Sequence, residues 1–342
     1  MAWQSFLDAH GATLNEGRLT FPQQSASPTD PLEQGAALIP LAHLGLIRFS
    51  GEESASFLQG QLSSDIREVD GTHCQLSSYS TPKGRMQASF VVFRRDNDYL
   101  LQVYGDLQES IQKRLGMFIL RSKTRTSDAS TELAGLALIG AQAEQLIIST
   151  YSPKARIEKG IQEDTQGGIS ILRLSEHVFH LFMPFALLAT EWQKLTAAGA
   201  RAAGTDSWAL SQIRSGTPWV SKATYEEFVP QMANLELVGG VSFNKGCYPG
   251  QEIVARTQYL GKTKRRMYRC TVKGTEPLAG QHVYSAELPD QSAGTIMLAA
   301  PSGNLEWEVL VVARIDHIEQ GLHLGSMDGP LLVKQPLPYS PD

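Results

Sequence analysis

The sequence predicts an α+β protein of roughly two or three domains. Its 342 residues are enough for more than one hydrophobic core. Up to about Gly261, strand hairpins and helical patterns are mixed without the strict alternation of a doubly wound sheet. After Gly261, short apolar segments separated by Gly, Pro, Asp and Ser are typical of a small barrel-like β domain.

The N-terminal region is predicted to begin with a short helix and a linker. Apolar residues near the start indicate a helix that ends at Gly11, and the segment 22–31, rich in Pro, Ser and Gln, reads as a loop. The apolar segment 38–49 begins the globular part. A helix interrupted by Gly60 is expected after Glu52, because apolar residues recur at helical spacing: Ala55, Leu58, Leu62 and Ile66.

A hairpin and a helix follow. Residues 89–93 and 99–103 read as two strands joined by a turn at Asp96. Asp106 is expected to cap the next helix, with Glu109 as its capping-box partner. The buried stripe of that helix is predicted to be Leu107, Ile111, Leu115 and Phe118.

The remaining elements divide the chain into its predicted domains. Strands are expected at 133–139, 169–174 and 178–183. One helix is expected to end near Leu146, and a second to span 185–198. A third helix is predicted to be capped by Asp206 and to carry Trp208. The β domain is predicted to contain strands at 267–272, 281–285, 294–298, 308–313 and 331–333. The predicted organisation is an N-terminal helix and linker (1–35), a first α+β unit (36–130), a second α+β unit (131–257) and a β-barrel-like domain (258–342).

Composition excludes several classes of protein. With 42% hydrophobic and 19% charged residues and a net charge of -5, the chain has no global positive charge to attract nucleic acid or an anionic membrane. Three cysteines, without CxxC or Cys/His spacing, argue against a disulfide framework or a structural metal site. The N-terminus lacks a secretory pattern, and no apolar run is long enough for a membrane helix. A cytoplasmic location is therefore expected.

The segment with the most chemistry is Lys245–Glu252, which reads Lys-Gly-Cys-Tyr-Pro-Gly-Gln-Glu. Its two glycines permit positive φ or a close approach to a ligand. Pro249 is typical of a first helical turn, and the chain after it reads as helical until Gly261. Cys247 would then lie just before a helix N-terminus and near Lys245, and both features favour a thiolate. The alternative is that Cys247 is a small buried apolar residue.

This octet resembles the signature of the YgfZ-type folate-binding proteins, which are relatives of the glycine-cleavage aminomethyltransferase (T-protein). Three other stretches resemble the same family: 228–236 (Phe-Val-Pro-Gln-Met-Ala-Asn-Leu-Glu), 57–65 (Phe-Leu-Gln-Gly-Gln-Leu-Ser-Ser-Asp), and Trp208-Ala209-Leu210 with Arg214-Ser215-Gly216. The resemblance extends from about residue 38 to about residue 270. It implies two ferredoxin-like units and a C-terminal β-barrel around a central channel that admits folate.

The resemblance also implies a function. Family members bind tetrahydrofolate or a one-carbon derivative, act in iron–sulfur cluster assembly or repair, and thereby affect tRNA modification. The implied partners are folate and iron–sulfur enzymes or assembly proteins. Cys247 and Lys245 are the implied chemical residues, and the implied cofactor-binding residues are Trp208, Arg214, Tyr248, Gln251 and Glu252.

Alternatives remain for several of these residues. Trp208 could stack on a pterin or aminobenzoyl ring, or pack in the core as an ordinary helix tryptophan. Gln251 and Glu252 could orient a ligand or cap the helix start. A folate-dependent one-carbon transferase that uses Cys247 is the alternative function.

Three positions depart from the family patterns. A second family tryptophan is expected near residue 44, where this chain has Leu44 after His43. The aminomethyltransferases have paired aspartates where Gln87 and Ala88 stand, and an amide cannot act as a carboxylate base. Their folate-contacting glutamate is replaced by the stretch that ends at His180. Glycine-cleavage chemistry is therefore not expected.

A basic run follows the signature: Lys262, Lys264, Arg265, Arg266 and Arg269. It could contact tRNA phosphates or the glutamate tail of folate. The alternative is a solvated strand and linker.

Overall fold

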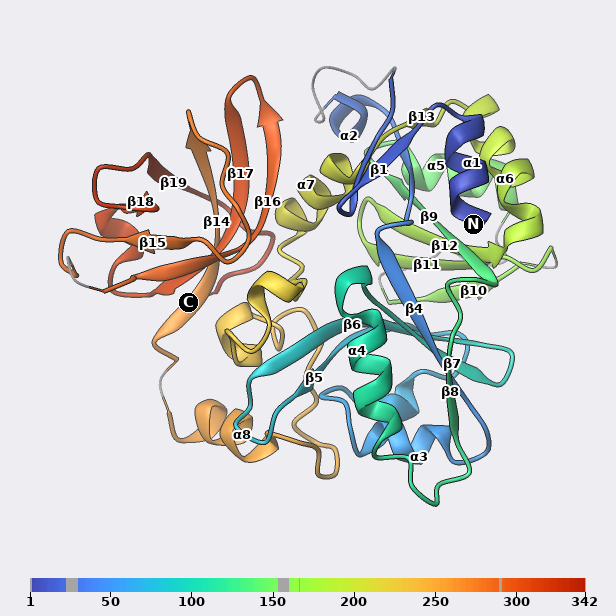
Figure 1. Cartoon of the computed structure of the whole chain (residues 1–342), viewed down its shortest axis with the longest axis horizontal. Helices are drawn as coiled ribbons and strands as arrows, with labels where there is room; N and C mark the ends of the chain where they lie inside the picture. Colours follow the sequence, from blue (N-terminus) through green and yellow to red (C-terminus); the bar gives the residue numbers. More distant parts are fainter. Residues whose placement is uncertain are drawn as a thin grey trace. The chain divides into compact units, whose positions relative to one another are not determined.

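The structure is a computed structural model that describes residues 2–22, 30–152, 160–165, 167–261, 263–288 and 291–341. The chain forms two compact units (Figure 1). Unit 1 comprises Met1–Phe57, Arg67–Gln75 and Val91–Ser211. Unit 2 comprises Leu58–Ile66, Leu76–Phe90 and Gln212–Asp342.

Unit 1 contains most of the helices. Its strands are β1 (Thr13–Asn15), β2 (Arg18–Thr20), β3 (Ala37–Pro40), β4 (Leu44–Ser50), β7 (Asp98–Tyr104), β8 (Arg125–Asp128), β9 (Leu133–Ile139), β10 (Gln162–Asp164), β11 (Ser170–Ser175), β12 (Val178–Pro184) and β13 (Arg201–Ala202). Its helices are α1 (Ala2–Ala9), α2 (Asp30–Gln34), α4 (Gly105–Gly116), α5 (Ala143–Tyr151) and α6 (Phe185–Ala197). Helices α3 (Ser54–Gln59) and α7 (Thr205–Ser215) begin in unit 1 and end in unit 2. The 3₁₀ helix η1 (Ile66–Glu68) begins in unit 2 and ends in unit 1.

A six-stranded sheet with the order β10-β11-β12-β9-β3-β13 forms the larger layer of unit 1. Helices α5 and α6 cover one of its faces (Figure 1). Residues alternate between the two faces of a strand, so in β12 Phe179, Leu181 and Met183 join the core beneath these helices. His180 and Phe182 consequently lie on the other face.

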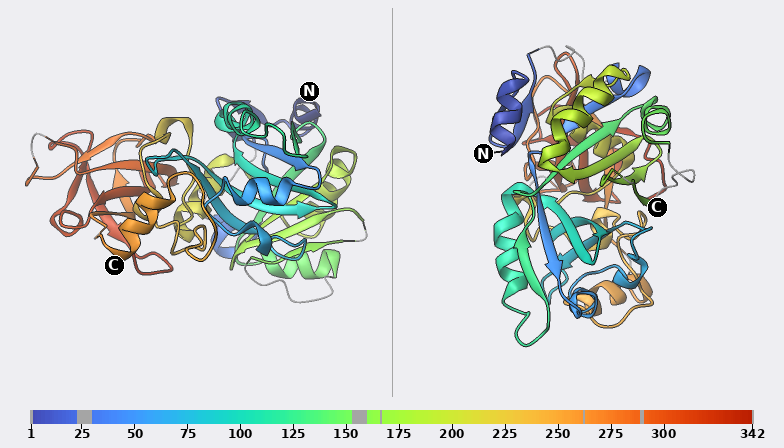
Figure 2. Two further views of the ribbon diagram at one scale, coloured as in Figure 1. Left: turned by 90° about the horizontal axis from the view of Figure 1, so that it is seen from below. Right: turned by 90° about the vertical axis from the view of Figure 1, so that its right-hand side faces the viewer.

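A second sheet of unit 1 contains β4, β7 and β8, and helix α4 lies along β4 and β8 (Figure 2, teal helix). Strand β6 (Met86–Arg95) begins in unit 2, and its residues from Val91 onward pair with β7. The two sheets of unit 1 are linked by an aromatic contact, because Phe93 of β6 stacks on Phe182 of β12 with ring centroids 4.5 Å apart.

Unit 2 contains a closed barrel with the strand order β14-β17-β16-β15-β18-β19 (Figure 1, orange to red). The barrel strands are β14 (Arg265–Lys273), β15 (His282–Tyr284), β16 (Gly294–Gly303), β17 (Glu306–Arg314), β18 (Leu322–Leu324) and β19 (Leu331–Gln335). The unit also contains β5 (Gln75–Ser80), α8 (Gln251–Tyr259) and the 3₁₀ helices η2 (Lys222–Thr224), η3 (Pro230–Ala233) and η4 (Ile318–Gln320). Buried apolar side chains from all six barrel strands fill its interior.

The predicted fold class is confirmed, and so are the hairpin, the strand at 133–139 and the barrel-like C-terminal domain. The helix predicted after Glu52 is present but ends at the expected interruption, because α3 ends at Gln59, just before Gly60, and does not continue to Leu62 and Ile66. Asp106 does not cap α4, since Tyr104 occupies the N-cap without a side-chain hydrogen bond. Phe118 lies beyond the end of that helix and is 48% exposed, so it is not part of the buried stripe.

Two further predictions at helix starts need correction, and one lies outside the described residues. Helix α7 begins at Thr205, so Asp206 lies in its first turn, where it forms an ion pair with Arg18. Pro249 precedes α8, which begins at Gln251. Most of the predicted linker, residues 23–29, lies outside the described part of the chain. No helix among the described residues is long and apolar enough to span a membrane.

Candidate functional site

Cys247 lies in an irregular loop of unit 2, shortly before α8. Its side chain is exposed, whereas Cys74 and Cys270 are buried. Burial raises the pKa of both buried thiols to about 12, so they stay protonated at neutral pH. Cys247 is therefore the thiol that solvent, a ligand or a partner can reach.

Lys245 anchors this loop. Its ammonium group is buried and donates hydrogen bonds to the carbonyl oxygens of Leu62 (2.5 Å) and Ser64 (2.8 Å). It also lies 5.1 Å from the centre of the Tyr248 ring, at cation–π distance. Lys245 and Tyr248 thus fix the backbone on both sides of Cys247, and they join the signature to the family-like stretch 57–65.

Gly250 holds the end of the signature against the turn at residues 81–85. Its φ is +83°, and a Cβ at this position would lie 2.6 Å from the carbonyl oxygen of Thr81 and 2.7 Å from the Cα of Gly84. Only glycine permits both the left-handed backbone and this approach. The turn at residues 81–85 and the loop that carries Cys247 are therefore packed backbone to backbone.

Gly246 is different, although the sequence suggested the same role for both glycines. It has no positive φ, and a Cβ there would meet nothing within 4 Å. The fold therefore does not require glycine beside Cys247. Its absent side chain leaves open space next to the exposed thiol.

Gln251 and Glu252 form the start of α8, where Gly250 is the N-cap and supplies no side-chain cap. Glu252 is exposed and Gln251 is half-buried. The helix is attached to η3 because the side-chain amide of Gln231 donates to the carbonyl oxygen of Val254 at 2.7 Å. Both predicted residues therefore lie on a helix that the stretch 228–236 holds in place.

A carboxylate that the sequence did not reveal lies beside Gln87. The buried Gln87 amide donates to the Tyr225 hydroxyl (2.6 Å) and to a Glu226 carboxylate oxygen (2.7 Å). Glu226 has a φ of +61°, which is uncommon for a residue with a side chain. No local pattern could have indicated this pair, because the two residues lie 139 positions apart.

Trp208 of α7 is fully buried within unit 1. The His43 ring lies edge-on to it at 4.6 Å between centroids, and the Tyr104 ring does so at 5.8 Å. These three residues come from α7, from the connection between β3 and β4, and from the end of β7. They form an aromatic cluster around the tryptophan that the family resemblance assigned to folate.

Two buried histidines adjoin this cluster. Nδ1 of His180 lies 2.9 Å from Oε1 of Gln102. Burial lowers the pKa of His43 and of His180 to about 3, and the charge of His43 adds to the lowering at His180. Both imidazoles are therefore neutral at physiological pH. In the sequence they stood out only as departures from family patterns.

The basic side chains are largely engaged within unit 2. Glu308 accepts hydrogen bonds from Arg214 (2.9 Å) and from Arg269 (2.8 Å), and the Arg266 guanidinium pairs with Glu236. Arg214 is thus part of an ion-pair network around the buried Glu308. Lys262 lies outside the described residues, and the side chain of Lys264 is exposed.

Arg265 faces another cation. It is directly opposite Arg314 in the ladder between β14 and β17, and burial together with Arg314 lowers the pKa of Arg265. Arg314 is held by two hydrogen bonds to Asp316, of 3.0 and 2.7 Å. Lys264 and Arg265 are therefore the members of the described basic run that remain candidates for an anionic partner.

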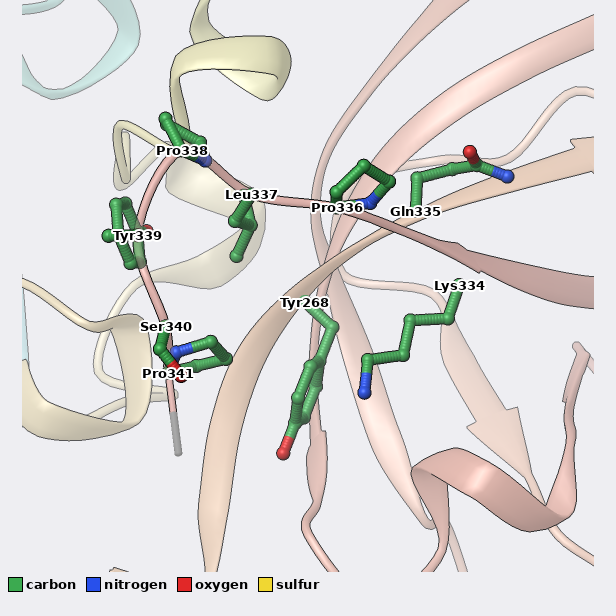
Figure 3. Close-up of a pocket in the computed structure, with 9 residues that line it drawn as sticks. All are labelled: Tyr268, Lys334, Gln335, Pro336, Leu337, Pro338, Tyr339, Ser340 and Pro341. Atoms are coloured by element: carbon green, nitrogen blue, oxygen red, sulfur yellow. The ribbon is translucent and has the colours of Figure 1, made fainter.

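Unit 2 also contains a cavity of about 460 Å³ between Tyr268, Lys334 and the C-terminal segment 335–341 (Figure 3). The Lys334 ammonium lies 5.3 Å from the centre of the Tyr268 ring and pairs with Glu319. None of the site residues predicted from the sequence lines this cavity. Within the described ranges, no group of three or more His, Cys, Asp or Glu residues could hold a metal ion.

The two sheets of unit 1 and the barrel of unit 2 form an aminomethyltransferase-like fold. The solved structure of glycine cleavage system aminomethyltransferase T from Bartonella henselae matches with a TM-score of 0.81 at 14% identity, covering 100% of this chain and 98% of that one. At this identity the match establishes the fold alone. A scan against models of known protein families finds no match.

Curated relatives identify the family. The tRNA-modifying protein YgfZ of Colwellia psychrerythraea is 30% identical over 315 residues, which cover 89% of this chain and 93% of the relative. The tRNA-modifying protein YgfZ of Sodalis glossinidius is 28% identical over 327 residues, covering 94% and 98%. The chain belongs to the YgfZ family, which confirms the resemblance that its motifs indicated.

Proposed function

We propose that this protein binds tetrahydrofolate or a one-carbon derivative and supports the assembly or repair of iron–sulfur clusters, including those of tRNA-modifying enzymes. The observation that carries the proposal is the exposed thiol of Cys247 on a loop anchored by the buried Lys245. Two findings support it: relatives named as tRNA-modifying proteins, and the fold of a glycine cleavage system aminomethyltransferase.

The thiol would act together with a partner. Iron–sulfur clusters are normally held by four thiolates, so one cysteine can supply only one ligand or exchange with a cluster-bearing protein. Such an exchange requires that another protein approach the sulfur closely. The open space at Gly246 and the exposure of Cys247 fit this requirement.

Unit 1 would take the aromatic part of folate. Trp208 supplies a large flat apolar surface. Both ring nitrogens of His43 are buried and have no hydrogen-bond partner among the described residues, so they suit a ligand with polar edges. When bound, tetrahydrofolate would supply one-carbon chemistry. The residues of unit 1 would bind and orient it.

The cellular test replaces Cys247 by serine in a strain without the endogenous protein. The assembly role predicts lower activity of iron–sulfur enzymes and fewer cluster-dependent tRNA modifications than with wild type at equal protein levels. The control is Lys273→Ala, because the side chain of Lys273 is 78% exposed. Full complementation by Cys247→Ser would refute a role for the thiol.

A folate-dependent transferase that uses Cys247 is a second candidate function. One observation favours it: Glu226 provides a carboxylate 2.7 Å from the Gln87 amide, which stands where the aminomethyltransferases have aspartate. Purified protein with a one-carbon folate would then show turnover that Glu226→Gln reduces. Wild-type turnover no faster than the reaction without protein would exclude this alternative.

Contact with tRNA would involve Lys264 and Arg265, together with Lys262. Reversing the charge of Arg266 would leave the buried Glu236 carboxylate without its ion-pair partner, so Arg266 is kept. The test therefore uses the double variant Lys264→Glu and Arg265→Glu. If this surface binds RNA, the double variant weakens tRNA binding and lowers its salt dependence. Equal binding by wild type and the double variant would exclude this surface.

A further inference from the structure

We propose that His43 and His180 recognise the polar edge of a bound pteridine ring through one N–H donor and two nitrogen lone pairs. This inference rests on the proposed function, because it names the part of folate that unit 1 takes. The starting observation is three buried ring nitrogens with no hydrogen-bond partner among the described residues: Nδ1 and Nε2 of His43, and Nε2 of His180.

Such atoms are rare in folded proteins. More than nine in ten buried polar groups have a partner, and an unsatisfied one costs roughly 1–3 kcal/mol. His43 is 6% exposed and His180 is 0% exposed, so bulk water does not compensate them. Two imidazoles with three unpaired nitrogens in one unit therefore indicate a ligand with matching polar groups.

The hydrogen-bonding capacity of each ring follows from its protonation. Both rings are neutral, so each carries one N–H and one lone pair. The Gln102 Oε1 atom only accepts hydrogen bonds, so Nδ1 of His180 donates to it and Nε2 keeps its lone pair. His43 contributes one donor and one acceptor. The two rings together thus offer two acceptors and one donor.

This set is complementary to an edge with two N–H groups and one carbonyl. A 2-amino-4-oxopyrimidine edge, as in a pterin, presents these groups side by side. The glutamate tail of folate carries carboxylates, which only accept hydrogen bonds and would meet the two lone pairs unfavourably. The histidines therefore select the pteridine end of folate over its tail.

The surrounding aromatic rings support a planar ligand. The centre of the His43 ring lies 4.6 Å from that of Trp208 and 6.5 Å from that of Tyr104. Leu44, next to His43, pairs with Tyr104, and Gln102, which contacts His180, lies two residues before Tyr104 on β7, so the two rings lie in the same region of unit 1. His180 is directed to this region because it lies on the face of β12 opposite α5 and α6.

The substitution His→Leu tests the proposal without unfolding the protein. Replacing the unpaired His43 ring by an apolar side chain of similar size is nearly neutral for stability, whereas His180→Leu leaves the buried Gln102 Oε1 without its donor and costs roughly 1–3 kcal/mol. Both variants should still fold, which urea unfolding would verify. The matched control is His177→Leu, because His177 lies three residues before His180 and its side chain is 54% exposed.

Isothermal titration with tetrahydrofolate gives the main readout. We expect each buried-histidine variant to bind at least about tenfold more weakly than wild type, the usual effect of losing one good hydrogen bond. The control His177→Leu should bind as wild type does. Nitrogen-15 NMR should show a shift of the His180 Nε2 resonance when tetrahydrofolate is added to wild type.

The outcomes separate the inference from the proposed function. Wild type that binds tetrahydrofolate while both variants bind equally well would overturn the histidine assignment and leave folate binding in place. An unchanged Nε2 resonance on saturation would also overturn it. Wild type that binds no tetrahydrofolate would overturn the proposed folate binding and the inference together.

Discussion

Replacing Gly250 by alanine should destabilise unit 2 strongly, whereas replacing Gly246 should not. An alanine at Gly250 must adopt a φ of +83°, and left-handed backbone costs about 1–2 kcal/mol for such a residue. Its Cβ would also lie 2.6 Å from the Thr81 carbonyl oxygen and 2.7 Å from the Gly84 Cα. Both atoms are backbone, so they cannot rotate away, and overpacking of this kind costs typically about 1–3 kcal/mol.

A small gain offsets these terms, because alanine lowers the entropy of the unfolded chain by about 0.4–1 kcal/mol. The net expectation is a loss of about 2–4 kcal/mol in the free energy of unfolding. Urea unfolding followed by circular dichroism would measure it. Gly246→Ala should stay within about 0.5 kcal/mol of wild type, since that site is open. Equal stabilities for the two variants would refute the packing of the signature against the turn at 81–85.

Three further predictions concern the same sites. Lys245→Met should lower the free energy of unfolding by about 2–4 kcal/mol in urea titrations, because two buried carbonyls lose a charged donor. Lys264→Met, at an exposed site, is the control. Equal free energies of unfolding for the two variants would show that Lys245 does not anchor the loop. Iodoacetamide should label native protein at one thiol, because Cys247 is exposed and the other two cysteines are buried, and unfolded protein at all three. Rapid labelling of the native Cys247→Ser variant would show that a second thiol is accessible. The folded pKa of about 3 for His43 and His180 lies below the unfolded value of 6.5, so the unfolded chain binds more protons and stability falls as pH drops below about 6.5. At pH 5.5 the loss relative to pH 7 should be about 1.3 kcal/mol per histidine, and the double Leu variant should lack it. Parallel pH profiles for the two proteins would show that these rings are not buried and neutral.

The local elements were well predicted where periodicity was strong. The hairpin around Asp96 and the strand 133–139 were recovered because alternating or continuous apolar runs indicate strands directly. The helix after Glu52 was overextended, since the apolar spacing continued past Gly60 although the helix ends at Gln59. Strand β18 was missed because three residues give too short a pattern.

The candidate site residues stay a prediction. The signature octet drew attention to Cys247 and its neighbours, because a long and chemically mixed motif is specific. Its geometry could not be read from the sequence: Lys245 contacts carbonyls more than 180 residues away, and Glu226 meets Gln87 across 139 positions. The histidine pair was equally hidden, since its meaning depends on which face of β12 is buried.

A tetrahydrofolate titration of wild type and Trp208→Ala, followed by intrinsic fluorescence, would show whether this chain binds folate at Trp208. We expect saturable binding by wild type and binding at least about tenfold weaker by the variant, since the loss of an aromatic stack is worth roughly 1–3 kcal/mol. Folded wild-type protein that shows no saturable change in fluorescence or in heat would contradict folate binding by this chain.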